Sequence, residues 1–545
     1  MQKSLVNKGN SVDSILEKLY NIGMETVCIT RQEYEEFQAQ KEELQTLKKQ
    51  FEELQRMNEY LLEQYRIRQR KMFGRSSEQI SGQISLFDEA EVTCDPEEKE
   101  PEIEEVKSYS RKKRVETKEK LPEDLPVRQV DYELKEEDRV CGQCGNTMAE
   151  IGTKVRERLV IVPAQAYILR EVEHTYACSN CSRNAEKTPF ASAKLPKALI
   201  PGSIATAETV AHIMTQKFVM GSPLYRQEQE LERNGIPLSR QTMSNWMVKT
   251  AGEYLEPIYR TLKERLIREE VLHADETTVQ VLHEEGKPPD SKSYMWLYRT
   301  GITSKEQTVV FEYKPNRKAE NPLKFLSGFH GYLHADGYSG YHSLPSEITV
   351  VGCHAHARRN FDEAYTALSA KMKEGSLAEQ GLKYYARLFD FEKSFAGMTP
   401  EERYNARQEK SKPWLEEFYK WLYAQNVSTK TAIGKAIQYM KDQKRYLMAY
   451  LQDGRLEMTN NLAERTIKPF IMARKNFLFS NTANGAKASA MIFSLIETAK
   501  ANKLSAYDYL RWVLRKAPEM DLKNNPERAE LLLPEKYDPN EFPDY

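Results

Sequence analysis

The chain of 545 residues is 40% hydrophobic and 30% charged, and its formal net charge is -1. This length predicts three or four domains with ample material for a large core. The sequence contains no run of about eighteen apolar residues, and its N-terminus lacks the apolar core of a signal peptide. These features argue against membrane-spanning and secreted proteins, so we expect a soluble protein in the reducing cytoplasm.

The near-zero net charge does not by itself suggest a nucleic-acid partner. DNA binding would need local clusters of Lys and Arg, because such clusters neutralise phosphates. An acidic stretch from Asp88 to Glu105 precedes the basic run Arg111 to Arg114. We interpret both first as parts of a solvated linker over residues 74–125, which are polar, acidic and Pro-containing.

Residues 1–73 predict a helical dimerisation region. Thr30 to Glu33 resemble a capping box, so a long helix should begin there and end near Phe73. Core-type positions recur every seven residues along it, at Phe37, Leu44, Phe51, Asn58 and Tyr65, and at Leu47, Leu54 and Leu61. This pattern predicts a coiled coil of about five heptads, and Asn58 favours a two-stranded homodimer. An intramolecular hairpin is the alternative.

Two CxxC pairs lie in residues 126–200, a segment expected to form a small zinc-ribbon-like module. Their cysteines are Cys141, Cys144, Cys178 and Cys181. Four thiolates at this spacing suit tetrahedral Zn²⁺, which would stabilise a module too small to build its own core. Residues 156–162 and 166–178 read as strands between the pairs. Cys28, Cys94 and Cys353 are isolated, and we interpret them as incidental.

Residues 201–268 predict a helical region with a helix-turn-helix-like segment over residues 224–255. A turn at Asn234–Pro237 separates two helices, and Ser239 caps the second. Such a motif places its second helix in the major groove. The expected base contacts are Arg240, Gln241, Ser244 and Asn245, with Met243, Trp246 and Met247 facing the core. An ordinary helical pair without a DNA role remains the alternative.

Residues 269–500 predict an α/β domain of the RNase H-like class. Three strand-like runs from about residue 271 are followed by a helix over residues 317–329 and by two more strands. Asp275 lies within the first strand and Asp336 at the end of the fourth, each preceded by His-Ala. Glu276 should point to the opposite face of the sheet, which makes it a poorer metal ligand. A single Asp at a strand end is otherwise a turn or cap residue.

A third carboxylate is expected at Glu464, in the first turn of a helix after Asn461. Its position also fits a capping arrangement, Asn461-x-x-Glu464, in which the carboxylate only reaches back to the backbone. Both readings stay open from spacing alone.

Several long motifs, in order along nearly the whole chain, resemble the large transposase of the insertion-sequence-66 family. They include KMFGRSSEQ (71–79), the CxxC pairs, HADET (273–277), HADGYSGY, CHAHARRNF and NNLAERTIKPFIMARKNFLFSNT, with SLIETAKAN beyond. The resemblance implies an acidic catalytic triad at Asp275, Asp336 and Glu464, holding Mg²⁺ or Mn²⁺. It also implies a helical insertion over about residues 361–455. Residues 501–545 would form a C-terminal helical tail.

The same resemblance implies that the protein acts on transposon-end DNA and target DNA, at the bacterial nucleoid, with small accessory proteins of the same element. In a two-metal mechanism, water attack would expose a 3′-hydroxyl that then attacks target DNA.

Basic residues near the triad are the expected phosphate contacts, because Arg binds phosphate oxygens in pairs. They are Arg358, Arg359, Arg465, Lys468, Arg474 and Lys475. His354 and His356 should line the same crevice as Arg358 and Arg359, with a weaker expectation of function. An ordinary polar helix face is the alternative for the residues near Glu464.

The sequence is also compatible with two functions other than that of a transposase. One is a standalone RNase H-like nuclease, such as a junction resolvase. The other is a non-catalytic regulator that binds DNA through the zinc module and the helix-turn-helix.

Overall fold

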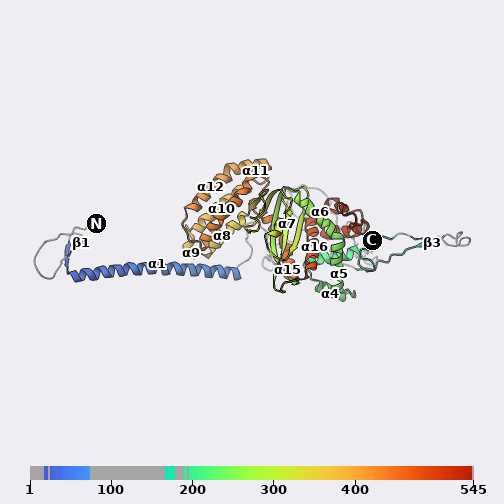
Figure 1. The fold of residues 1–545 in the computed structure, drawn as a ribbon, viewed down its shortest axis with the longest axis horizontal. Coiled ribbons are helices and arrows are strands. Elements are labelled where there is room, and N and C mark those ends of the chain that lie inside the picture. The colour runs from blue at the N-terminus through green and yellow to red at the C-terminus, as the bar shows by residue number, and fades with distance from the viewer. Residues whose placement is uncertain (1–17, 23–24, 74–165, 178–189, 193–194, 543–545) are drawn as a thin grey trace, which may run out of the picture. The chain divides into compact units, whose positions relative to one another are not determined.

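A computed structural model describes residues 18–22, 25–73, 166–177, 190–192 and 195–542 (Figure 1). The chain divides into two compact units, one of residues Arg75–Lys194 and one that contains the rest. Within the described ranges, no helix has both the length and the apolar character needed to cross a membrane.

A short hairpin and one long helix form the N-terminal part. Strands β1 (Lys18–Ile22) and β2 (Glu25–Ile29) pair antiparallel, and α1 runs from Arg31 to Phe73. The capping box is present: the Thr30 amide donates to Glu33 Oε2 at 2.7 Å, and the Glu33 amide donates to Thr30 Oγ1 at 3.2 Å. The predicted start and end of the helix are therefore confirmed. Because α1 is continuous, the alternative of a hairpin within this segment is wrong.

The smaller unit contributes one described strand pair, β3 (Thr175–Ala177) with β4 (Phe190–Ser192), which runs antiparallel. The expectation of a strand over residues 166–178 is wrong for residues 166–174, which have no regular structure and are exposed. A β-prone sequence forms a strand only where another strand pairs with it. The four CxxC cysteines and the expected strand 156–162 lie outside the described residues.

A group of helices precedes the sheet. They are α3 (Ala207–Phe218), α4 (Leu224–Arg233), α5 (Arg240–Thr250) and α6 (Glu256–Ile267), the last two joined by a π-helical turn, Ala251–Leu255. The predicted turn and cap are confirmed: Gly235 has φ +75°, and Ser239 Oγ accepts from the Thr242 amide at 3.1 Å. Met243, Trp246 and Met247 are buried, as expected for the core face of α5.

The central sheet is mixed. Its main strands are β5 (Val271–His283), β6 (Lys292–Thr300), β7 (Val309–Lys314), β8 (Gly331–Ala335) and β9 (Ile348–Gly352). They lie in the order β7-β6-β5-β8-β9; β5 to β7 form an antiparallel meander, and β8 and β9 run parallel to β5. A short strand, β10 (Ser480–Thr482), pairs with the far end of β5. The sheet thus places the end of β8 beside the first half of β5, where Asp275 lies.

Helices cover both faces of this sheet. Helices α15 (Asn461–Phe477) and α16 (Ala483–Ala501) cover one face, where Phe311 packs against the rings of Phe470 and Phe493. On the other face Tyr298 stacks on Phe325 of α7 (Glu320–Phe325), with ring centroids 3.7 Å apart. Helix α7 is shorter than the predicted 317–329, because Gly328 at φ +85° turns the chain before β8.

A helical insertion separates β9 from α15 (Figure 1). Its helices are α8 (His354–Ala367), α9 (Ala370–Lys373), α10 (Leu377–Ser394), α11 (Pro400–Ala406), α12 (Lys412–Ala424), α13 (Ala432–Asp442) and α14 (Lys444–Met448). Most of them share a core that also includes Val271 and Val351 of the sheet, and beside it the buried Arg407 forms a two-fold ion pair with Glu392 at 2.9 and 2.7 Å. Helix α17 (Ala506–Lys516) and short 3₁₀ turns follow α16 at the C-terminus.

Candidate active site

The site begins with two parallel strands that carry the same tripeptide, His-Ala-Asp, at residues 273–275 and 334–336. The strand register pairs His273 with His334, and their rings stack with centroids 4.2 Å apart. Side chains two residues apart share a face of a strand. Asp275 therefore lies on the face of His273, and Asp336 follows β8 directly beside it.

The two histidines are buried and uncharged. Burial lowers the pKa of His273 to about 3 and the pKa of His334 well below its ordinary range. Neutral, stacked rings can pack between neighbouring strands without the cost of a buried charge. We infer that this pair fixes the spacing of the strands just before the two aspartates.

Helix α15 brings Glu464 to the same face. Asn460, directly before the helix, is buried; its Oδ1 lies 2.9 Å from His273 Nδ1, and its Nδ2 donates to the Ala274 carbonyl at 2.8 Å. These bonds hold the first turn of α15 beside Asp275. Two residues beyond Glu464, Thr466 Oγ1 accepts from Arg299 of β6 at 2.6 Å. The start of α15 is thus tied to two central strands.

The capping arrangement considered for Glu464 is not what this part of the chain shows. Asn460 is the N-cap and α15 begins at Asn461, so Glu464 is the fourth helical residue. No side-chain cap bond forms there, and Glu464 Oε1 is buried without a hydrogen-bond partner among the described residues. The Glu464 carboxylate instead points toward the end of β9 and the start of α8.

Asp275, Asp336 and Glu464 form an acidic cluster, and the charges of the other carboxylates affect the pKa of Asp275. Its pKa is raised well above the ordinary value of 3.8, chiefly by burial and then by the negative charges of Glu276, Asp336 and Glu464. Like charges gathered at a partly buried point are costly unless a cation joins them. Three carboxylates fit a hard divalent ion such as Mg²⁺, which prefers oxygen ligands. Asp336 and Glu464 are 27% and 26% exposed, so the cluster is open to solvent.

Glu276 faces the other side of the sheet, as predicted. Its side chain is 1% exposed; one carboxylate oxygen accepts from Arg317 Nε at 2.7 Å and the other from Tyr341 Oη at 2.6 Å. Arg317 also reaches within 4.0 Å of Asp336 Oδ2. Sequence reasoning missed Arg317, because only the fold brings the segment before α7 to the end of β8.

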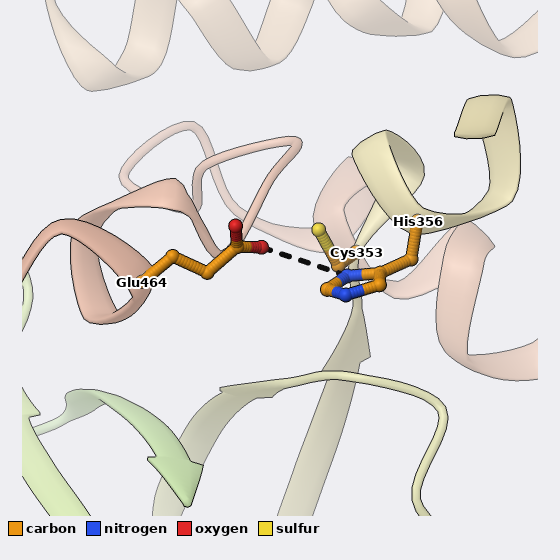
Figure 2. A group of neighbouring side chains, drawn as sticks. All are labelled: Cys353, His356 and Glu464. Atoms are coloured by element: carbon orange, nitrogen blue, oxygen red, sulfur yellow. Dashed lines mark ion pairs between the residues drawn. The ribbon is translucent and has the colours of Figure 1, made fainter. Parts of the chain in front are cut away.

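Two further side chains adjoin Glu464. His356 Nδ1 lies 3.6 Å from Glu464 Oε1, and Cys353 completes a group whose possible ligand atoms all lie within 4.8 Å of one another (Figure 2). The interpretation of Cys353 as incidental is therefore corrected: it precedes α8, is buried, and its Sγ accepts from the Asn460 amide at 3.2 Å.

The expectation that His354 lines the same crevice is wrong. His354 is buried in the insertion, with Nε2 2.9 Å from the Leu447 carbonyl, and burial lowers its pKa to about 4. Residues two apart on a helix point in nearly opposite directions, because each residue advances about 100°. Hence His356 can face Glu464 only if His354 faces away.

Among the basic residues predicted to contact phosphate, one bonds to the sheet and the others are at least partly exposed. Arg474 donates to Thr278 Oγ1 at 3.0 Å and to Thr277 Oγ1 at 3.3 Å, so it holds α15 against β5. Arg465 and Lys475 of α15 are exposed, and Lys468, Arg358 and Arg359 are partly exposed.

The predicted base contacts of α5 are on its surface. Arg240, Gln241 and Asn245 are exposed, and Gln241 Nε2 donates to Asn245 Oδ1 at 3.0 Å. Arg240 lies over the ring of Tyr225 on α4.

Comparisons with known proteins agree with this architecture. A family model described as "Transposase IS66 family" matches residues 202–488, which include all three carboxylates. A model described as "zinc-finger binding domain of transposase IS66" matches residues 138–182, which include both CxxC pairs. Models described as "Transposase C of IS166 homeodomain" and "IS66 C-terminal element" match residues 60–130 and 494–534.

Among curated proteins, the chain is similar to two proteins of Sinorhizobium fredii that are described as uncharacterized. It is 30% identical to y4jD over 428 residues, which are 76% of this chain and 81% of the relative. It is 29% identical to y4hP over 429 residues, 75% of each chain. With the four family matches in order along the sequence, the chain belongs to the IS66 transposase family.

Proposed function

We propose that the protein cuts the ends of its insertion-sequence DNA and joins them to target DNA, with Asp275, Asp336 and Glu464 as catalytic carboxylates. The observation that carries this proposal is the convergence of the three charges. They come from β5, the end of β8 and the first turn of α15, and both partners raise the pKa of Asp275.

The strand order supports an RNase H-like fold for this domain. An antiparallel meander, β7-β6-β5, continued beyond β5 by the parallel strands β8 and β9, with helices on both faces, is the order expected from the sequence. In this order the first and fourth strands are neighbours, so Asp275 within the first and Asp336 at the end of the fourth can share cations.

Asp275, Asp336 and Glu464 would hold Mg²⁺ or Mn²⁺. When bound, such ions would supply Lewis-acid chemistry, which favours the attack of a hydroxyl on a phosphodiester and stabilises the leaving oxygen. Asp275 forms the inner wall of the site, whereas Asp336 and Glu464 border the solvent side, where a DNA strand can approach. Arg317, 4.0 Å from Asp336, would help to orient that carboxylate.

Two basic surfaces would position the DNA backbone. One is formed by Arg358 and Arg359 of α8, on the helix that carries His356. The other is formed by Arg465, Lys468 and Lys475 of α15, which follow Glu464. Arg474, whose guanidinium also bonds to β5, would border this second surface. Further away, Arg240, Gln241 and Asn245 would read transposon ends from α5.

The protein would act as a dimer through α1. Leu54 and Phe51 are 69% and 68% exposed on this helix, and the remaining heptad positions are exposed as well. A helix with an exposed seam of this kind is stabilised when a second copy covers it. Cys141, Cys144, Cys178 and Cys181 would hold the structural Zn²⁺ of the zinc-finger module.

The test is a cleavage and strand-transfer assay on labelled element-end DNA with Mg²⁺. Asp275→Asn, Asp336→Asn and Glu464→Gln should each bind DNA and yield no cleaved or joined product. Glu276→Gln is the matched control: the amide keeps one oxygen for Arg317, and Tyr341 can accept from its nitrogen. This variant should retain cleavage within several-fold of wild type.

The outcomes separate the rival functions. Joined products support a transposase, whereas cleavage without joining supports a standalone nuclease. DNA binding without cleavage, even when the small accessory proteins of the element are added, supports a regulator. An active Glu464→Gln variant would place the third ligand elsewhere.

A further inference from the structure

We propose that Cys353, His356 and Glu464 form a second metal site, for a thiophilic divalent cation such as Zn²⁺. This site would share Glu464 with the acidic triad. The binding itself depends only on these three side chains, whereas its effect on catalysis rests on the proposed function.

The three side chains converge closely enough to hold one tetrahedral ion after a modest inward movement. Bonds of about 2.0–2.3 Å to zinc at tetrahedral angles put donor atoms roughly 3.3–3.6 Å apart. His356 Nδ1 and Glu464 Oε1 lie 3.6 Å apart, and the Cys353 sulfur, one His356 nitrogen and one Glu464 oxygen all lie within 4.8 Å of one another. The side chains converge from the junction of β9 with α8 and from the first turn of α15 (Figure 2). Three protein ligands leave a fourth tetrahedral position for a water molecule.

Unmatched polar atoms give an independent reason to expect a ligand. His356 Nδ1 and Glu464 Oε1 are both buried, and they face each other at 3.6 Å, too far apart for a hydrogen bond; neither has a hydrogen-bond partner among the described residues. A buried polar atom without a partner costs about 1–3 kcal/mol. A cation placed between the two atoms would satisfy both. The Asn460 amide already donates to Cys353 Sγ at 3.2 Å, a bond that a metal-bound thiolate would retain.

The donor set determines which cation binds. Mg²⁺ prefers oxygen, so it belongs with Asp275 and Asp336. Thiolate and imidazole select Zn²⁺ or a similar transition metal. Glu464 therefore lies between an oxygen-rich pair and a sulfur–nitrogen pair. Zinc bound at Cys353 and His356 would withdraw Glu464 from the triad and inhibit Mg²⁺-dependent cleavage.

The first measurement is metal stoichiometry on the full-length protein, with Co²⁺ as a spectroscopic probe. Cobalt–thiolate absorption should report one equivalent more in wild type than in Cys353→Ala or His356→Gln. The second variant changes a partly exposed residue, so it remains informative if the first does not fold. Cys28→Ala, which removes another cysteine outside the CxxC pairs, should behave as wild type. Equal stoichiometry in all four proteins would overturn the site. So would an extra equivalent that Asp275→Asn removes and Cys353→Ala retains.

The second measurement is Zn²⁺ inhibition of Mg²⁺-dependent cleavage. The Zn²⁺ concentration for half inhibition should rise at least about tenfold in His356→Gln relative to wild type, equivalent to about 1.4 kcal/mol. An unchanged value would refute the link to catalysis. If wild type never cleaves DNA but the extra cobalt equivalent depends on Cys353, the metal site stands and the proposed function fails. If cleavage requires the triad but no extra equivalent binds, the reverse holds.

Discussion

The bond network of Asn460 makes a sharp prediction about how the site is held together. Asn460→Ala removes a side-chain amide that forms hydrogen bonds with two buried groups, His273 Nδ1 and the Ala274 carbonyl. Each buried group left without a partner costs about 1–3 kcal/mol, so the folded state should lose about 2–6 kcal/mol. With a denaturant slope of about 3 kcal/mol/M in urea, the unfolding midpoint should fall by roughly 0.7–2 M.

The assay is urea unfolding followed by tryptophan fluorescence, since Trp296 is buried in the same sheet. Asn461→Ala is the matched control: it makes the same chemical change one residue along, where no side-chain hydrogen bond is found in the described structure. Its midpoint should stay within about 0.2 M of wild type, as for a surface substitution of about 0.5 kcal/mol. Equal midpoints for the two variants would refute the inference that Asn460 anchors α15.

Three further predictions concern charge and assembly. The folded-state pKa of Asp275 is raised, so its contribution to stability is present below pH 3.8 and is lost as pH rises through the folded pKa. Without Mg²⁺, Asp275→Asn should therefore be more stable than wild type at neutral pH, with the difference closing below about pH 4 in thermal melts. Arg407→Leu leaves a partner carboxylate unpaired and should cost about 3–5 kcal/mol in denaturant unfolding. Arg260→Leu, at an exposed ion pair, should cost less than about 1 kcal/mol, and equal losses would contradict the burial argument. Leu54→Asp on the α1 seam should convert a dimer to a monomer in sedimentation, whereas Lys49→Asp should not; a dimer in both would exclude α1 as the interface.

The sequence predicted correctly those features that depend on interactions between residues close together in the chain. The capping residues Thr30 and Glu33 located the start of α1, and Ser239 located the start of α5. The alternation around Asp275 assigned Glu276 to the opposite face, and its bonds to Arg317 and Tyr341 agree. These features depend on neighbours within a few residues, which a single sequence displays directly.

The parts that sequence reasoning missed depend on contacts between distant segments. Cys353 looked isolated because its partners, Asn460 and Glu464, lie more than a hundred residues away. Similarly, the assignment of His354 and His356 to one crevice ignored their separation around a helix. Likewise, the sequence does not show that Arg474 bonds to Thr278 of β5, because the two residues are 196 positions apart.

The helical insertion enters and leaves the α/β domain at nearly the same point. The His354 amide donates to the Met458 carbonyl at 3.1 Å, and the Asn460 amide donates to the Cys353 sulfur at 3.2 Å. These two hydrogen bonds join the first residues of the insertion to the residues that follow it, so they close the base of the loop that the insertion forms. Closing a loop of twice the length costs only about 0.6 kcal/mol more. The insertion can therefore be longer or shorter at little entropic cost while the backbone at Cys353 and Asn460, and with it Glu464, keeps its place.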